Sequence, residues 1–383
     1  MSLFLITFFT VYGSIHFYFF LKFRSAFASL SSGCYGMFGL FLLLLLLSPV
    51  LIHVIESYHP NWPVQIFARL SYVWMGFLFL FFCLSLTNDL YTGAVFLIRF
   101  LSANHIAIPP PGTRTGFLAC ICLSVLICVY GFYEAYHIRI DHLVIPTTKL
   151  SSQLSRFRIV QISDLHLGLM TEPEQINRIV QAIKKTKPDL LVCTGDLIDG
   201  QPDSFAPQLD PLRHINPPYG KYAVTGNHEF YVGIERAVMW LKWSGFKVLR
   251  GETADVAGLI NLVGVDDHEA FRSQLSPSTP KTNHAMMSKS NRFTVFLKHR
   301  PLIDPDMQKI ADLQLSGHTH QGQIFPFGLI TRLFFPYHSG TYTLENGFQL
   351  HVSRGTGTWG PPMRFLAPPE ISVIDLVRTG KED

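Results

Sequence analysis

The sequence predicts an N-terminal bundle of membrane-spanning helices followed by an α/β domain. Charged residues make up only 15% of the 383 residues, against about 25% in ordinary soluble domains. They are nearly absent from four long stretches within residues 1–136. From residue 157 onward, short apolar runs end in glycine, acidic or histidine residues, and an amphipathic helical pattern lies between the first two runs. This alternation is typical of an α/β sheet domain.

The four apolar stretches are long enough to cross a bilayer, which takes about 20 residues of helix. They lie at about 1–21, 34–54, 69–88 and 116–134. The run "GLFLLLLLL" has no polar face, which argues against a buried helix of a soluble protein. A cleaved signal peptide would explain only the first stretch, which lacks a basic n-region. The stretch "TGAVFLIRFL", interrupted by Arg99, is expected to extend the third helix or to lie at the interface.

Basic residues in the loops give an expected orientation. Lys22 and Arg24 follow the first helix, Arg99 and Arg114 lie between the third and fourth, and only Arg69 marks the second loop. The positive-inside rule then places the first and third loops in the cytoplasm and the C-terminal half on the extracytoplasmic side. The basic residues that follow the last helix favour the opposite orientation: Arg139, Lys149, Arg156 and Arg158.

The composition restricts the partners. The net charge is +4 and no basic cluster is present, so nucleic acid is not expected as a partner. Five of the six cysteines lie in or beside the apolar stretches, and Cys193 is the only one in the C-terminal half. The redox compartment is therefore not readable from disulfide spacing, and the oligomeric state is not readable either.

The expected domains are a transmembrane domain at 1–136, a linker at 137–156 and an α/β domain at 157–383. "FRIVQIS" reads as a buried strand, and "TEPEQINRIVQAIKKTKPD" as a helix with Thr171 as N-cap and Glu174 completing a capping box. "LLVCTGD" is the next strand, parallel to the first. Six further apolar runs predict strands, so we expect two packed sheets flanked by helices: "YAVTGN", "LINLVGV", "FTVFLKH", "LQLSGH", "FQLHVSRGTG" and "EISVIDL".

Polar side chains gather where these strands end. Asp164 and His166 follow the first strand two positions apart, so they point the same way if the chain stays extended. This pair suits a metal ion or a simple ion pair. The ends of the later strands supply further residues of ligand type: Asp196, Asn227, His228, His299, His318 and His320. Nitrogen and oxygen ligands without thiolate suit Mn, Fe, Zn, Ni or Co.

The ordered motifs "QISDLHLG", "TGD", "GNHEFY", "LKHRP" and "SGHTHQGQ", with the later "SRGTGTWGPPMRFLAPPEI", cover about residues 157–375. This series resembles the calcineurin-like metallophosphoesterases, and the wording resembles their membrane-anchored, multi-pass bacterial-type subgroup. The resemblance implies a dinuclear centre that hydrolyses a phosphomonoester or phosphodiester through a metal-bridging hydroxide. One ion would take Asp164, His166, Asp196 and His320, and the other would take Asp196, Asn227, His299 and His318.

The remaining site predictions rest on chemistry. His228 follows a ligand asparagine and is expected to protonate the leaving oxygen or to stabilise its charge. Arg354 is a candidate substrate-binding guanidinium. His268 and His284 are less favoured alternatives to His299, because they lie in the polar stretch 266–291. A lipid-linked or envelope phosphate is the expected substrate if the bilayer anchor concentrates the site there. The alternatives are a soluble monoester, or a non-catalytic membrane sensor or transport component that binds a phosphate ligand.

Overall fold

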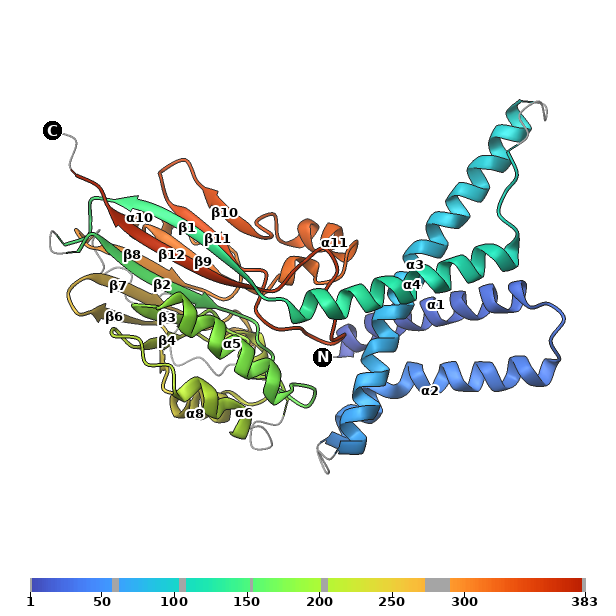
Figure 1. The fold of residues 1–383 in the computed structure, drawn as a ribbon, viewed down its shortest axis with the longest axis horizontal. Helices are drawn as coiled ribbons and strands as arrows, with labels where there is room; N and C mark the ends of the chain where they lie inside the picture. The colour runs from blue at the N-terminus through green and yellow to red at the C-terminus, as the bar shows by residue number, and fades with distance from the viewer. Residues whose placement is uncertain are drawn as a thin grey trace. The chain divides into compact units, whose positions relative to one another are not determined.

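The computed structural model describes residues 2–56, 62–102, 108–151, 154–200, 206–272 and 290–380. The contacts between residues divide the chain into two units. The first is Met1–Tyr133 with Gly360–Met363, and the second is Glu134–Trp359 with Arg364–Asp383. The first unit is helical and the second is built on two β-sheets (Figure 1).

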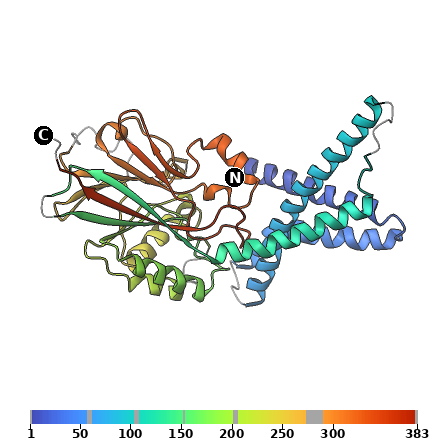
Figure 2. The same cartoon turned by 45° about the horizontal axis from the view of Figure 1, so that its top comes forward.

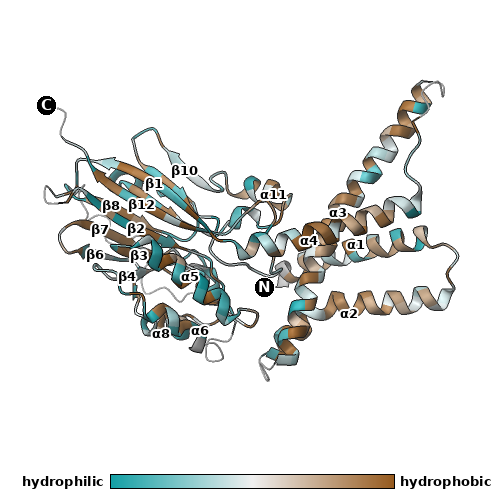
Figure 3. Ribbon diagram, viewed as in Figure 1, coloured by the Kyte–Doolittle hydropathy of each residue, from teal (hydrophilic) through white to brown (hydrophobic). Residues whose placement is uncertain are grey.

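The first unit contains four long apolar helices: α1 (Ser2–Ala26), α2 (Ser32–Glu56), α3 (Trp62–Leu101) and α4 (Thr113–Tyr136). Each is long and apolar enough to cross a membrane, and Figure 3 shows apolar residues along most of their length. Many large apolar side chains on them are exposed, which is the arrangement of lipid-facing helices rather than of a soluble bundle. Apart from Met1, which lies outside the described residues, each predicted stretch lies within one of these helices.

Helix α3 is longer than predicted, with 40 residues, or about 60 Å at 1.5 Å per residue. The segment "TGAVFLIRFL" therefore extends the third helix. Asp89 forms an ion pair with Lys22 of α1 and accepts a hydrogen bond from the Tyr18 hydroxyl at 2.6 Å. A paired carboxylate follows the apolar stretch 69–88 directly, as expected near the end of the hydrocarbon core.

The second unit contains two six-stranded mixed sheets. The first has the order β1-β12-β2-β3-β4-β5 and the second β10-β11-β9-β8-β7-β6. The strands of the first sheet are β1 (Arg139–Thr147), β12 (Glu370–Arg378), β2 (Arg156–Ile162), β3 (Leu190–Cys193), β4 (Lys221–Ala223) and β5 (Lys247–Val248). The strands of the second are β10 (Gly340–Thr343), β11 (Gln349–Val352), β9 (Leu313–Ser316), β8 (Phe293–Leu297), β7 (Ile260–Gly264) and β6 (Glu252–Val256).

The sheets pack face to face around an apolar core, because alternate side chains of their strands point to one side. Phe157, Leu190 and Val192 of the first sheet belong to one buried cluster with Leu262 and Val295 of the second. The central strands β2, β3 and β4 run parallel, as do β7, β8, β9 and β11. The architecture predicted from the sequence, two packed mixed sheets flanked by helices, is confirmed.

Helices cover the outer face of the first sheet. Helix α5 (Pro173–Thr186) lies with α6 (Ala206–Arg213) and α8 (Ile234–Trp243) along one side of the unit (Figures 1 and 2). The apolar face of α5, which includes Ile179 and Ile183, is buried against strand residues such as Val160. This face is the 3.6-residue pattern seen in the sequence.

Two local predictions differ from the structure. The segment 137–156, expected to be a linker, contains β1, which pairs in parallel with β12 over nine residues. Thr171 does not cap α5, because Pro173 stands at the first helical position and Glu172 is the N-cap without a side-chain cap bond. A proline at this position has no backbone N–H to satisfy. The Thr171 hydroxyl instead accepts a hydrogen bond from the Gly168 N–H at 2.9 Å.

Candidate metal centre

The ligand-type residues follow the carboxyl ends of parallel strands in both sheets: β2, β3 and β4 in the first sheet, and β8 and β9 in the second. Parallel strands share their carboxyl ends at one edge of each sheet, and the two edges meet at the site. Among the residues that the structure describes, three groups of side chains have ligand atoms that all lie within 4.8 Å of one another. They are Asp164, His166 and His320; His166, Asp196 and His228; and Asp196, His299 and His318. Except for His318, which is half-buried, these side chains are buried.

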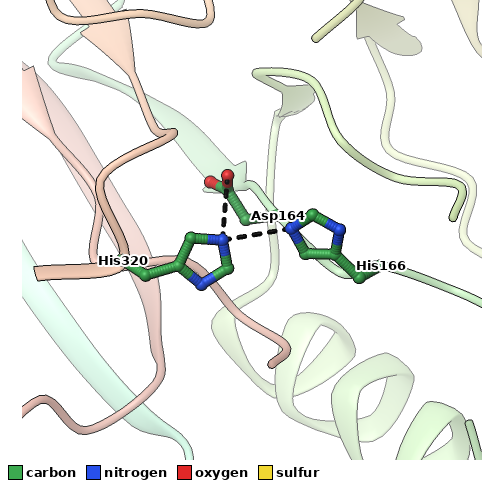
Figure 4. Close-up of side chains that lie close together, drawn as sticks. All are labelled: Asp164, His166 and His320. Atoms are coloured by element: carbon green, nitrogen blue, oxygen red, sulfur yellow. Dashed lines mark hydrogen bonds and ion pairs between the residues drawn. The ribbon is translucent and has the colours of Figure 1, made fainter. Parts of the chain in front are cut away.

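The first group joins the loop after β2 to the loop after β9. The Nε2 atom of His320 lies 3.4 Å from Oδ1 of Asp164 and 3.1 Å from Nε2 of His166. Figure 4 shows the carboxylate and the two imidazole nitrogens facing one another. Two imidazole nitrogens at this distance are compatible only if one carries a proton or both face a shared cation.

Asp196 connects this group to the other two. Its Oδ2 atom lies 3.9 Å from Nε2 of His166 and 3.1 Å from Nε2 of His299. The same His299 nitrogen lies 3.1 Å from Nδ1 of His318. On its other side, the His299 ring donates from Nδ1 to the Thr194 carbonyl at 2.8 Å, which directs Nε2 toward Asp196.

The backbone at these residues adopts a conformation that side chains rarely favour. Asp164, His166, Asp196, His318 and His320 all have positive φ, between 47° and 74°. This left-handed conformation costs most side chains about 1–2 kcal/mol per residue, and it is better tolerated by Asp and His than by others. Such strain persists only where the surrounding structure enforces it, and it tends to accumulate at functional sites.

Glycines let the loops approach one another closely. A Cβ atom on Gly226 would lie 2.1 Å from Oδ1 of Asp196, and one on Gly317 would lie 2.2 Å from Oδ2 of Asp164. Neither position has room for any other residue. The glycines that precede the ligand-type residues in the sequence are therefore required by packing at the site itself.

The electrostatics favour ligand-ready forms of some groups but not of His299: burial opposes its protonation, but Asp196 outweighs burial and raises its pKa to about 10. Burial would raise the pKa of the Asp164 carboxyl, but His320 and His299 outweigh it and hold that pKa below the ordinary value. Burial, with the nearby charge of His299, lowers the pKa of His318 to about 3. Burial also lowers the pKa of His320 to about 4, although Asp164 opposes this. Ionised carboxylates and neutral imidazoles are the forms that bind metal.

One further atom fits a cation. Oδ1 of Asn227 is buried and has no hydrogen-bond partner among the residues that the structure describes. A buried amide oxygen without a partner is costly, and a divalent ion would satisfy it. The donor set as a whole, carboxylate, imidazole and amide oxygen without thiolate, fits divalent ions of the kind predicted.

Two residues of the site were not predicted. Asp199 lies between two imidazoles, with Oδ1 3.0 Å from Nδ1 of His228 and Oδ2 3.4 Å from Nδ1 of His166. Burial opposes protonation of His228, but Asp196 and Asp199 outweigh it and raise its pKa to about 9. Asp199 stands in "GDLIDG", three residues after Asp196. A second acidic residue this close to a proposed ligand is the sequence feature that could have pointed to it.

The second is Glu229, in "GNHE". Its carboxylate is fully buried and accepts four backbone N–H bonds. The donors are Asp196 at 3.0 Å, Leu197 at 2.8 Å, Ile198 at 3.2 Å and Gly226 at 2.7 Å. Glu229 therefore joins the loop after β3 to the loop after β4. Because all four partners donate, the ionised carboxylate is the form that fits.

Arg354, expected to bind substrate, is paired with protein groups in the structure. Its guanidinium donates to the Pro368 carbonyl at 3.0 Å and pairs with Glu370 at 2.9 Å and Asp141 at 2.5 Å. These contacts account for the charge, so Arg354 is not among the side chains that we propose for the site. Of the alternatives to His299, His268 belongs to none of the three groups, and His284 lies outside the described residues.

The site thus combines a two-sheet α/β domain with Asp, Asn and His side chains at its strand ends that could hold metal ions. Residues 157–322 match the family model described as calcineurin-like phosphoesterase, and the chain belongs to the calcineurin-like metallophosphoesterases. It is 36% identical over 259 residues to an uncharacterized metallophosphoesterase of Aquifex aeolicus, covering 67% of this chain and 99% of that one.

Two further relatives extend well beyond the region that this chain matches. A transmembrane protein with metallophosphoesterase domain from Danio rerio is 32% identical over 312 residues, which is 78% of this chain and 70% of the relative. An uncharacterized metallophosphoesterase of Helicobacter pylori is 35% identical over 251 residues, which is 64% of this chain and 66% of the relative. The name of the first of these agrees with the four apolar helices that precede the domain here.

Proposed function

We propose that this chain is a membrane-anchored phosphoesterase that uses two divalent metal ions to hydrolyse a phosphomonoester or phosphodiester. One ion would be held by Asp164, His166, Asp196 and His320, and the other by Asp196, Asn227, His299 and His318. The observation that carries the proposal is the convergence of Asp, His and Asn side chains from five separate loops. Strained backbone and closely packed glycines hold them there.

Divalent ions would supply positive charge for the phosphate oxygens and would lower the pKa of water toward about 7. The chain's own contribution is to fix their ligands. Asp196 lies between the groups containing His166 and His299, so a shared carboxylate sets the spacing of the two positions. The Thr194 carbonyl holds the His299 ring in the orientation that presents Nε2.

His228 is proposed as the proton donor to the leaving oxygen. Its Nδ1 atom faces Asp199, which leaves Nε2 available to a substrate. The two carboxylates around it, Asp196 and Asp199, favour the protonated imidazole, which is the form a general acid needs. Asp199 acts through His228, so we assign it a positioning role.

The proposed substrate is a phosphate ester presented at the membrane, either lipid-linked or part of the cell envelope. The four apolar helices support this, because anchoring concentrates the site near such a substrate. The full-length protein in nanodiscs with Mn²⁺ should be assayed against p-nitrophenyl phosphate, bis(p-nitrophenyl) phosphate and phosphatidic acid. Activity confined to the soluble monoester would rule out the lipid substrate and leave the helices as a tether.

Variants separate an enzyme from a metal-dependent binding protein. Asp196→Asn should lose most of the bound metal and the activity, because both ions share this carboxylate. His228→Gln should keep the metal and lose about 10²–10⁴-fold in kcat. His214→Gln, with an exposed side chain in the same unit, is the matched control. A wild-type protein that holds its metals but turns over none of the esters favours the non-catalytic sensor. Equal metal content in wild type and Asp196→Asn contradicts the proposed site.

A further inference from the structure

Helix α11 (Phe327–Phe334) is an unusual element of the second unit, because none of its residues is buried. Its five large apolar side chains are exposed by 47–81% in the structure: Phe327, Leu329, Ile330, Leu333 and Phe334. At 150–250 Å² for each such side chain, this surface amounts to roughly 450–760 Å². Patches of this size on a protein surface are usually sites of interaction.

The apolar side chains form one continuous face. At 100° per residue they fill an arc of about 160°, and Gly328 lies opposite the middle of that arc. Gly328 is where the helix packs against the protein: a Cβ on Gly322 would lie 2.3 Å from the Gly328 Cα, and a Cβ on Gly328 would lie 2.8 Å from the Gln321 carbonyl oxygen. The helix therefore rests on its glycine and presents its apolar face outward.

Both ends of α11 lie beside the candidate metal centre. Gly322, on which the helix rests, belongs to the short helix η3 (His320–Gly322), whose first residue is a proposed ligand. Phe335, directly after α11, contacts the ring of His318 edge-on at 4.9 Å between centroids. The apolar face of α11 is thus close in the chain to two proposed metal ligands.

The charges around α11 suit a lipid surface. The segment 313–344 contains no Asp or Glu, and Arg332 is the only Lys or Arg in it. No acidic residue within this segment would repel anionic head groups. Aromatic and aliphatic residues beside a basic one are typical of helices that lie in the bilayer interface.

The same chain contains helices that would anchor it in a bilayer. Four helices able to span a membrane precede this domain, and only His137 and Ile138 separate α4 from β1. We propose that α11 is an interfacial helix whose outer face inserts into the lipid of the membrane that anchors the protein. This inference uses exposure, packing and chain connectivity, and it does not depend on the metal chemistry.

Photocrosslinking in the full-length protein tests the proposal. p-Benzoylphenylalanine would replace Leu333, in protein reconstituted in liposomes of phosphatidylethanolamine and phosphatidylglycerol. The matched control is the same substitution at Met239 of α8, which is 52% exposed and apolar. After irradiation, mass spectrometry should find lipid adducts at 333 at least ten times more often than at 239.

A scan along the helix sharpens the test. Lipid adducts should be frequent with the label at 329, 330, 333 and 334 and fewer at 332, following the helical period. Since these side chains are exposed, the label should leave the thermal unfolding temperature unchanged. Adducts to a second copy of the chain, equal labelling at 333 and 239, or the absence of lipid adducts at 333 would each overturn the proposal.

Discussion

Glu229 offers the sharpest test of how the site is held together. Replacing it with glutamine keeps the size of the side chain but leaves one oxygen in place of two. That oxygen can serve either the Leu197 and Ile198 N–H groups or those of Asp196 and Gly226. The new amide NH₂ then faces two backbone donors, which is a repulsive contact in a fully buried place.

The expected cost follows from the bonds lost. Two hydrogen bonds to a charged acceptor, at about 1.5–3 kcal/mol each, give a loss of about 3–6 kcal/mol. For a domain of this size, each kcal/mol lowers the midpoint of thermal unfolding by about 2–4 °C. Glu229→Gln should therefore unfold about 6–24 °C below wild type. Since the loop carrying Asp196 loses its support, the affinity for Mn²⁺ should fall as well.

The assay is thermal unfolding of the full-length protein in nanodiscs, followed by tryptophan fluorescence, with Mn²⁺ titration of the metal-free form. Glu235→Gln is the matched control, because it makes the same chemical change at an exposed position in the first turn of α8. The control should lose less than about 1 kcal/mol. If the two variants have the same unfolding temperature and the same affinity for Mn²⁺, the four N–H bonds do not hold the loops, and the role assigned to Glu229 is wrong.

Three other predictions concern the site, the fold and the topology. In Gly317→Ala the new Cβ would lie 2.0 Å from Ser163 Oγ and 2.2 Å from Asp164 Oδ2, so Mn²⁺ affinity should fall about 10–100-fold. Calorimetric titration checks this. The prediction is contradicted by an affinity equal to that of Gly380→Ala, where the new Cβ would meet no described residue within 4 Å. Burial, with a smaller effect of Arg213, lowers the pKa of Lys221 to about 8. The folded state therefore releases this proton before the unfolded state, so between about pH 8 and 10.5 wild type should gain stability relative to Lys221→Met as the pH rises. Unfolding of both proteins at several pH values measures this, and a stability difference between them that stays the same across the pH range refutes it. A bacterial alkaline phosphatase fused after residue 383 should be active if the domain is extracytoplasmic, whereas a fluorescent green fluorescent protein fusion would place it in the cytoplasm.

The sequence allowed the central strands and the ligand-type residues to be predicted, because both depend on local patterns. "FRIVQIS", "LLVCTGD" and "LQLSGH" each combine a buried strand with the loop that follows it. The first two strands lie in the first sheet and the third in the second sheet, and the packing of the two sheets brings the loops together. The same argument places Asp164, Asp196 and His318 near one another without any knowledge of distances. The structure shows these side chains close together, and their metal roles stay a proposal.

What escaped prediction depends on contacts between distant segments. Strand β1 is exposed at most of its positions and pairs with β12, more than 200 residues later, so its own sequence reads as a linker. Asp199 becomes important only because the turn after β3 brings it to His228. Arg354 looked available to substrate because its partners, Asp141 and Glu370, lie on the two paired strands. In each case the decisive partner is set by the fold and not by the local pattern.

The backbone of the site suggests why so many supports are needed. Five residues in left-handed conformation cost together at most about 5–10 kcal/mol, and less where Asp and His tolerate this region, against a net stability of about 5–15 kcal/mol for a whole domain. The four bonds to Glu229 and the close packing at Gly226 and Gly317 offset part of this cost and keep the loops in a single arrangement. Metal ions bound only by the folded chain would offset more of it. The loops that bring the ligands together would then be stable chiefly when metal ions are bound. Folding of this domain would therefore be linked to occupancy of its metal centre.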